Sequence, residues 1–210
     1  MAWSDKTLKE FQDALASDAP TPGGGSAAGV ALGQAAALAT MVSDLTLSKE
    51  RYNDGWNVAN KIKAITEDML SEALELATRD SDAFDAVVAS FRMSKSTDEE
   101  KESRIKAIHL ATLGAAEVPF QTAILALELL KLLPELAEKG NPNALSDVGV
   151  SALLASTALK GGIFNVEINL QSLPSDQGME MRKRLPQLIE DGRIYSKRCM
   201  DAVRTRLSDS

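Results

Sequence analysis

Residues 19–46, APTPGGGSAAGVALGQAAALATMVSDLT, are the stretch of sequence that decides the fold. Pro20 and Pro22 fix the backbone φ at their positions, so the chain enters this stretch in a stiff, extended form. From Ser26 to Thr46 the residues are apolar nearly all round, which is typical of a buried central helix. The many Ala and Gly residues let neighbouring backbones pack closely. The stretch therefore predicts an all-α protein built around a long central helix.

The entry to that helix is a candidate ligand site. Three consecutive glycines accept backbone angles closed to other residues and let a ligand or another chain approach closely. The first turn of the helix offers unpaired N–H groups to an anion or a carbonyl. No Gly-Lys-Ser/Thr follows, so the nucleotide phosphate-binding loop is excluded. The cradle would consist of Pro22, Gly23, Gly24, Gly25 and Ser26; a purely structural helix-entry turn is the alternative.

Helical periodicity extends over almost the whole chain. Apolar residues recur at spacings of three and four, without β alternation, a fixed-period repeat or a flexible linker. Turns are expected at 140–143 and 172–178, and Pro119 is expected to bend the helix that contains it. The predicted helices are 7–17, 26–46, 51–78, 80–91, 96–133, 147–170 and a last helix to 207. We therefore expect a single-domain helical bundle over residues 1–210.

Composition narrows the class of partner. The 210 residues are 44% hydrophobic and only 4% aromatic, which favours helix packing over a sheet sandwich. A net charge of −7 argues against nucleic acid as a partner, because phosphate binding needs a concentrated basic surface. The apolar run 27–42 is interrupted and short for a bilayer span, so no membrane partner is expected. Cys199 has no disulfide partner and fits a reducing cytoplasm, and the single His109 makes no metal site.

Two acidic positions are candidate general bases. Asp82 lies at an expected helix start, just before the apolar residues Phe84 and Val87, where partial burial would raise its pKa. Capping of that helix is the alternative for this acidic pair, Asp80 and Asp82. Asp147 lies in the opening turn of the 147–170 helix.

Other polar residues are candidates for ligand contact. Lys49 and Tyr52 are three residues apart and would share a helix face; an exposed Lys and an interfacial Tyr are the alternative. Asn165 and Asn169 lie one turn apart beside Val and Ile, where each amide needs hydrogen-bond partners. A polar ligand, a partner subunit or a core network would supply those partners.

Four segments, taken together, resemble the cyclodeaminase/cyclohydrolase family. That family comprises the formiminotetrahydrofolate cyclodeaminase domain and stand-alone bacterial methenyltetrahydrofolate cyclohydrolases. The matching segments are LASDAPTPGGGSAAGVALGQAAALATMVSDLTLSKERY (15–52), DSDAFDAVVASFRMSKSTDEEKESR (80–104), AAEVPF (115–120) and GNPNALSDVGVSALLASTALKGGIFNVEINL (140–170). The sequence departs from the usual pattern at Ser48, where Gly is common, and at Met93-Ser94-Lys95, where Leu-Pro-Lys is common.

The resemblance implies an all-helical homodimer with a folate site in a groove that involves the dimer interface, acting without a metal or cofactor. The expected reaction is hydrolysis of 5,10-methenyltetrahydrofolate to 10-formyltetrahydrofolate. The ammonia-releasing cyclodeaminase reaction and a non-catalytic folate-binding dimer are the alternatives.

Roles for individual residues follow from this chemistry as expectations. Asp147 and Asp82 would act on water and the cationic bridge, and Lys49 with Tyr52 would orient water or the pterin. Lys95 or Lys160 would meet the glutamate carboxylates of the folate.

Overall fold

The computed structural model describes residues 2–208, which form helices and contain no strand. Residues 1, 209 and 210, the ends of the expected 1–210 domain, lie outside the described residues. The α-helices are α1 (Leu8–Leu15), α2 (Gly24–Leu47), α3 (Trp56–Phe91), α4 (Asp98–Lys139), α5 (Leu145–Gln171) and α6 (Met179–Ser208). Short 3-10 helices are η1 (Trp3–Asp5), η2 (Glu50–Gly55) and η3 (Pro142–Ala144). The expected all-α class is confirmed.

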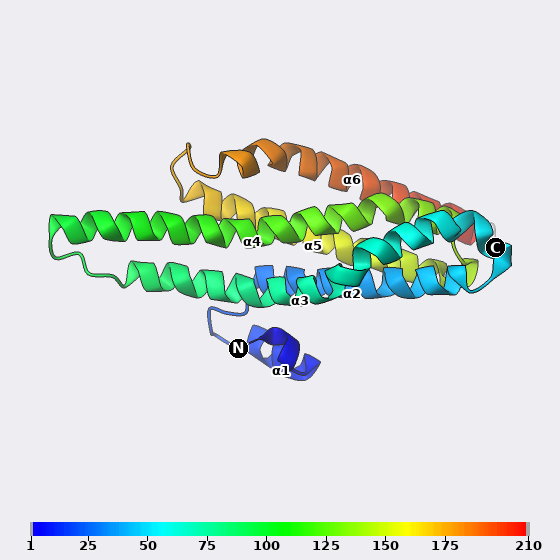
Figure 1. Ribbon diagram of the computed structural model, residues 1–210, viewed down its shortest axis with the longest axis horizontal. Coiled ribbons are helices and arrows are strands. Elements are labelled where there is room, and N and C mark those ends of the chain that lie inside the picture. Colours follow the sequence, from blue (N-terminus) through cyan, green and yellow to red (C-terminus); the bar gives the residue numbers. More distant parts are fainter. Residues whose placement is uncertain (1, 209–210) are drawn as a thin grey trace.

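The long helices lie side by side in one elongated bundle (Figure 1). Helix α2 packs against α3 and α5, α4 packs against α3 and α5, and α6 covers α4 and α5. Buried alanines and leucines fill the interior, as the low aromatic content predicts. At Gly29 a Cβ atom would come within 2.9 Å of the Ala73 carbonyl oxygen, so α2 and α3 touch backbone to backbone. The close packing expected from the small residues of the central helix is confirmed.

Helix α3 differs from the sequence expectation. A break was expected between residues 78 and 80, but α3 is one continuous helix from Trp56 to Phe91. The Asp-Ser-Asp triplet was interpreted as a helix start, and that interpretation is wrong. Asp80 lies in the interior of helix α3. Its carboxylate accepts a hydrogen bond from Ser26 in the first turn of helix α2 and does not cap its own helix.

Helix α4 begins at the expected place. The Thr97 side chain accepts from the Glu100 backbone N–H, and the Glu100 carboxylate accepts from the Thr97 N–H, which forms a capping box. The helix continues through Pro119 and Pro134 to Lys139, beyond the expected end at Leu133. Tertiary packing on α3, α5 and α6 therefore outweighs the loss of two backbone donors.

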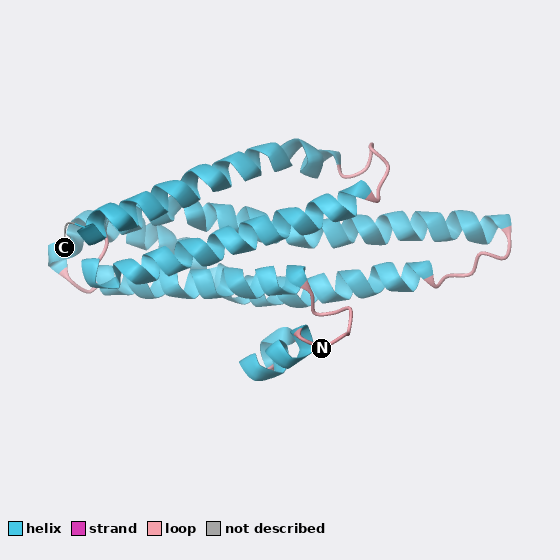
Figure 2. Ribbon diagram, turned by 180° about the vertical axis from the view of Figure 1, so that it is seen from behind, coloured by secondary structure: helices cyan, strands magenta, loops and turns pink. Residues whose placement is uncertain are grey.

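Helices α2 and α5 run antiparallel and set the positions of the candidate residues. The first turn of α2 meets the last turns of α5, because a Cβ on Gly24 would lie 3.7 Å from the Asn165 amide nitrogen. Farther along, the Ser151 hydroxyl donates to the Ala35 carbonyl at 2.8 Å. The C-terminal end of α2 and the N-terminal end of α5 therefore share the opposite end of the bundle (Figure 1), and Figure 2 shows the same bundle from behind.

Three helical segments, 24–47, 98–139 and 142–171, are long and apolar enough to cross a membrane by length and composition. Between 44% and 56% of each apolar window is buried inside the bundle. The expected absence of a membrane partner stays a prediction.

Cys199 is buried on α6, and burial raises the pKa of its thiol to about 12.

Candidate functional site

A cavity of about 240 Å³ opens at the N-terminus of α2. The loop before α2, which contains a cis Thr21–Pro22 peptide bond, forms one wall. The other walls come from α3, α4 and α5. The lining residues are Pro20, Thr21, Gly23, Gly24, Gly25, Asp80, Phe84, Ala115, Asn165, Ile168 and Asn169. Gly23, Gly24 and Gly25 of the predicted cradle therefore line a pocket, whereas Pro22 and Ser26 are not among its lining residues.

Asp80 is the acidic side chain of this pocket. Its Oδ2 accepts a hydrogen bond from the Ser26 hydroxyl at 3.0 Å, and the Ser26 backbone N–H also bonds to the carboxylate. Burial raises the pKa of Asp80 above the ordinary value of 3.8, and the two bonds from Ser26 oppose that rise. A carboxyl group in a cavity whose pKa is raised by burial is a candidate for acid–base catalysis.

Gly25 is required by the position of Asp80. A Cβ atom at residue 25 would lie 2.0 Å from Asp80 Oδ1 and 2.5 Å from its Cγ. The space left by this glycine is thus filled by a side chain of the protein, and the carboxylate occupies the N-terminal end of α2. At Gly25 the place expected for an anionic ligand is taken by the protein's own carboxylate, and the role of the rest of the cradle stays a prediction.

We expect Gly25→Ala to displace the Asp80 carboxylate. The added methyl group overlaps Asp80 Oδ1, so the Ser26–Asp80 hydrogen bond is lost. The free energy of unfolding should fall by about 1–3 kcal/mol. Thermal unfolding followed by circular dichroism measures the change. Gly114→Ala on α4 is the control, since nothing lies within 4 Å of a Cβ there. Equal stability of both variants would contradict this account of Gly25.

Asn165 and Asn169 contribute amide oxygens to the pocket. The Asn165 Nδ2 donates to the Gly161 carbonyl at 2.8 Å, and the Asn169 Nδ2 donates to the carbonyls of Ala115 and Asn165 at 2.9 Å. These bonds fix both side chains. Their amide oxygens accept no hydrogen bond from the described residues and are open to a donor. A core network and a ligand contact are therefore both compatible with this arrangement, and the third alternative, a partner subunit, stays a prediction.

The pocket as a whole is rich in acceptors and has no lysine or arginine among its lining residues. One carboxylate and two amide oxygens favour a cationic ligand, or one that carries several N–H donors. Among residues 2–208 no group of three His, Cys, Asp or Glu side chains is placed to hold a metal ion. A half-buried carboxyl group beside two amide acceptors can support acid–base chemistry on a positively charged organic group.

Asp82, the expected base, does not join this pocket. Its side chain is exposed, whereas Asp80 is half-buried. The expected partial burial of Asp82 is wrong, because a helix turns 100° per residue and two positions along α3 point in different directions. The signal that could have identified Asp80 was a continuous 3.6-residue period across 56–91, which places Ala73, Ala77 and Asp80 on one face.

The remaining candidates lie elsewhere on the same chain. Asp147 is in the first turn of α5, 18 residues before Asn165, which corresponds to about 27 Å along the helix. Lys49 and Tyr52 lie at that same far end, beyond the C-terminus of α2. They do not share an α-helical face, since Lys49 caps a 3-10 helix and Tyr52 has non-helical backbone angles.

The two lysines expected to meet the glutamate carboxylates are also apart from the pocket. Lys95 is exposed in the connection between α3 and α4. Lys160 lines a groove between α5 and α6 with Leu159, Ile163 and Phe164. Neither contacts the cavity at Asp80.

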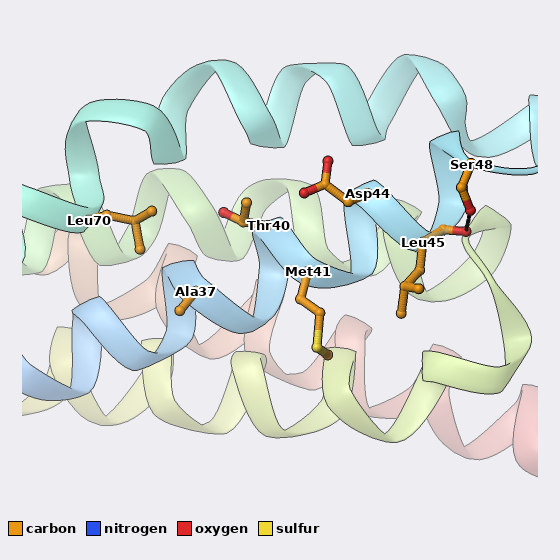
Figure 3. A pocket seen from close by; sticks show the side chains of 7 residues that line it. All are labelled: Ala37, Thr40, Met41, Asp44, Leu45, Ser48 and Leu70. Atoms are coloured by element: carbon orange, nitrogen blue, oxygen red, sulfur yellow. Dashed lines mark hydrogen bonds between the residues drawn. The ribbon is translucent and has the colours of Figure 1, made fainter.

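The neighbouring helices α2 and α5 both expose apolar side chains. On α5 the exposed residues Val150, Leu153, Phe164 and Ile168 follow one helical stripe, and they are 46%, 54%, 67% and 64% exposed. On α2 a shallow hollow of about 620 Å³ leaves Met41 and Leu45 at the surface. Figure 3 shows both side chains pointing away from α3, while Asp44 points toward α3 and pairs with Lys63. We call this surface the α2–α5 face.

Comparisons with known proteins agree on one family. The family profile described as formiminotransferase-cyclodeaminase matches residues 7–186. A methenyltetrahydrofolate cyclohydrolase from Methylorubrum extorquens is 34% identical over 205 residues, which cover 97% of this chain and 99% of that protein. The formimidoyltransferase-cyclodeaminase of Rattus norvegicus is 28% identical over 203 residues, and this chain spans only 38% of its length.

A solved structure extends the likeness to the fold. The crystal structure of formiminotetrahydrofolate cyclodeaminase from Thermotoga maritima matches with a TM-score of 0.79 and 30% identity, covering 98% of both chains. The resemblance stated from the four sequence segments is confirmed. The chain belongs to the formiminotransferase-cyclodeaminase family of enzymes.

Proposed function

We propose that this protein hydrolyses 5,10-methenyltetrahydrofolate to 10-formyltetrahydrofolate. The observation that carries the proposal is the single half-buried carboxylate of Asp80 in a pocket without a cationic side chain. The methenyl bridge is an amidinium-like cation, which such a carboxylate attracts. The relative from Methylorubrum extorquens, matched over its whole length and named a methenyltetrahydrofolate cyclohydrolase, supports this choice of reaction.

In the proposed mechanism Asp80 acts as the general base. A water molecule adds through its oxygen to the bridge carbon, and Asp80 accepts one proton of that water. The adduct is a neutral tetrahedral carbon between N5 and N10. The C–N5 bond then breaks, N5 takes the proton held by Asp80, and the hydroxyl loses its proton as the formyl group forms. The balance is one water consumed and one proton released. The bridge carbon is already electrophilic, so the proposal needs no cofactor.

The amide oxygens of Asn165 and Asn169 would orient the substrate. The pterin ring presents N–H donors, and two fixed acceptors on one side of the pocket match them. Orientation of this kind places the bridge carbon between Asp80 and the attacking water.

We also propose that the functional unit is a homodimer joined through the α2–α5 face. A cavity of about 240 Å³ is smaller than the roughly 300–1,000 Å³ usual for small-molecule sites, so one chain encloses only part of a folate. Apolar side chains that cover a whole face are usually buried by a partner. Gln34, Thr157 and Lys160 interrupt the face, which favours a protein partner over lipid.

A twofold axis through the middle of α5 would complete the site. Helix α5 spans 145–171, so its midpoint is residue 158. Rotation about that point places Asp147 of the partner subunit beside Asn169 of this chain, because 147 and 169 are equally far from 158. The partner's Lys49 and Tyr52 lie at the same end as its Asp147. The candidates that are about 27 Å apart in one chain would thus meet across two chains.

The cyclodeaminase reaction is the second candidate function. It also passes through a tetrahedral carbon between N5 and N10, and the relative from Thermotoga maritima is named for it. The formimidoyltransferase-cyclodeaminase from Rattus norvegicus matches over only 38% of its length, whereas the relatives from Methylorubrum extorquens and Thermotoga maritima match over 99% and 98%, so length alone does not separate the two reactions. We propose the cytoplasm as the location, on the ground of the lone Cys199.

The two reactions are separated by their substrates. Purified protein is mixed with methenyltetrahydrofolate, and the loss of its near-ultraviolet absorbance is followed against a buffer control. We expect an accelerated loss with formation of 10-formyltetrahydrofolate. Ammonia release from formiminotetrahydrofolate without that loss would favour the cyclodeaminase, and failure of both reactions would favour a non-catalytic folate-binding dimer.

A further inference from the structure

The N-terminal segment is attached to the pocket region through one tryptophan. The Trp3 backbone N–H donates to the Thr78 hydroxyl, and its indole Nε1–H donates to the Ser81 hydroxyl, both at 2.9 Å. The Trp3 ring also packs edge-on against Phe11, with ring centres 5.5 Å apart. In Figure 1 helix α1 lies apart from the long helices of the bundle. Trp3 is thus the link between this segment and α3.

The indole begins a chain of hydrogen bonds that ends at Asp80. The Ser81 and Ser26 hydroxyl oxygens are 3.0 Å apart, and Ser26 donates to Asp80 Oδ2 at 3.0 Å. An indole N–H only donates, so Ser81 accepts from Trp3. Ser26 gives its single proton to Asp80 and must therefore accept from Ser81. Every proton in the chain then points from Trp3 toward the carboxylate.

We propose that Trp3 is a positioning residue for Asp80: its indole N–H fixes the direction of the Ser81 and Ser26 hydroxyls so that Ser26 donates to the carboxylate. Without the indole donor, Ser81 would be free to turn its proton elsewhere, and Ser26 could donate to Ser81. Asp80 would then lose a bond that favours its ionised form. Hydrogen bonds in such chains strengthen one another, so an effect three links away is expected.

Among residues 2–208, Asp80 is the one charged side chain that lines the pocket. The facing residues from α2, α4 and α5 are Gly25, Ser26, Ala115, Asn165 and Asn169, and none of these titrates. On α3, Asp82 is exposed and Arg79 is paired with Glu72. In the N-terminal segment, Asp5 is exposed and Lys6 is half-buried at the end of η1. The two bonds from Ser26 are the interactions that oppose the effect of burial on the pKa of Asp80.

The kinetic test compares two variants of the N-terminal segment, and this arm rests on the proposed function. Trp3→Phe keeps an aromatic ring against Phe11 but removes the donor. We expect the acid limb of its pH–rate profile to move to higher pH by about half a unit. At a given pH on that limb the rate should be roughly threefold lower than in the wild type, and the plateau at higher pH should be unchanged. Phe11→Leu is the control, because it loosens the same packing and keeps the indole N–H; its profile should match the wild type.

Ser81→Ala breaks the same chain one link later and guards against misfolding of Trp3→Phe. It should move the acid limb in the same direction but by less, because Ser26 loses only the strengthening by Ser81 and has no second hydroxyl to which it could donate. Equal profiles for Trp3→Phe, Ser81→Ala and the wild type would overturn the proposal. So would a loss of the same size in Trp3→Phe and Phe11→Leu at every pH, since that would indicate a merely structural role.

A second measurement does not depend on any activity. The indole N–H resonance of Trp3 is followed by ¹⁵N NMR during a pH titration of the intact protein. We expect it to shift with the ionisation of Asp80 and to stop shifting in Asp80→Asn. Trp56, whose indole donates to the Thr46 carbonyl at 3.2 Å at the other end of the bundle, is the internal reference. A Trp3 resonance that ignores pH, or that still titrates in Asp80→Asn, would refute the chain even if the protein hydrolyses methenyltetrahydrofolate.

Discussion

Asp80→Asn is expected to lower the rate of methenyltetrahydrofolate hydrolysis by about 10²–10⁴-fold, the usual contribution of a positioned general base. The amide has nearly the same shape as the carboxyl, so Ser26 can still donate to its oxygen. What the amide cannot do is accept a proton from water. The loss should therefore appear in kcat more than in KM, measured as initial rates at saturating and limiting substrate.

The same substitution that lowers the rate should not lower the stability of the folded protein. The pKa of Asp80 is raised in the folded protein, so the folded state holds the proton more tightly than the unfolded state. Stability consequently falls as the pH rises from the ordinary Asp value of 3.8 through the raised value. The neutral amide removes this loss, and the unfolding temperature of Asp80→Asn at pH 7 should be no lower than that of the wild type.

Asp85→Asn is the matched control for both measurements, because Asp85 is exposed on the same helix. Its rate and unfolding temperature should equal those of the wild type. An Asp80→Asn variant with full activity would remove Asp80 from the mechanism. If Asp82→Asn were inactive instead, the expectation drawn from the sequence alone would be restored.

Asp147→Asn is expected to lower turnover by about 10²-fold, although Asp147 lies about 27 Å from the pocket of its own chain. In the proposed dimer the partner's Asp147 faces the pocket from the other side and would accept the hydroxyl proton as the formyl group forms. Helix α5 begins at Leu145, so this carboxylate is also held at a helix N-terminus. Initial rates measure the loss, and size-exclusion chromatography compares the oligomeric state of the variant with that of the wild type.

The control for this substitution is Asp54→Asn, which removes an exposed carboxylate from the same end of the bundle. It should leave the rate unchanged. Wild-type turnover by Asp147→Asn would show that the far end of the bundle takes no part in the reaction. An equal loss in both variants would point to a general effect of charge at that end.

Much of the fold could be predicted from local patterns. The apolar run 26–46, the helix start at 96 and the turn at 140–143 all depend on neighbouring residues, and the structure has each of them near its expected place. The break expected in α3 failed for a reason that is not local. An Asp-Ser-Asp triplet favours a helix start only when its side chains bond to their own backbone, and here Asp80 bonds to Ser26 of another helix.

The candidate site could be predicted only in part for the same reason. The glycine-rich entry was identified because three glycines before a helix are a local signal. The use of Gly25 was not, since it depends on a carboxylate 55 residues later that comes to lie on it. The separation of Asp147 and Lys49 from the pocket is likewise a property of the antiparallel packing of α2 and α5, which no segment reveals by itself.

The most direct test of a site shared between two chains is the activity of a mixed dimer. Asp80→Asn and Asp147→Asn chains carrying different affinity tags are produced together, and the heterodimer is isolated through both tags. It contains one pocket with both substitutions and one with neither. The account predicts about half the wild-type rate of methenyltetrahydrofolate hydrolysis from this heterodimer, far above either parent. A heterodimer no more active than the average of the two homodimers would contradict it.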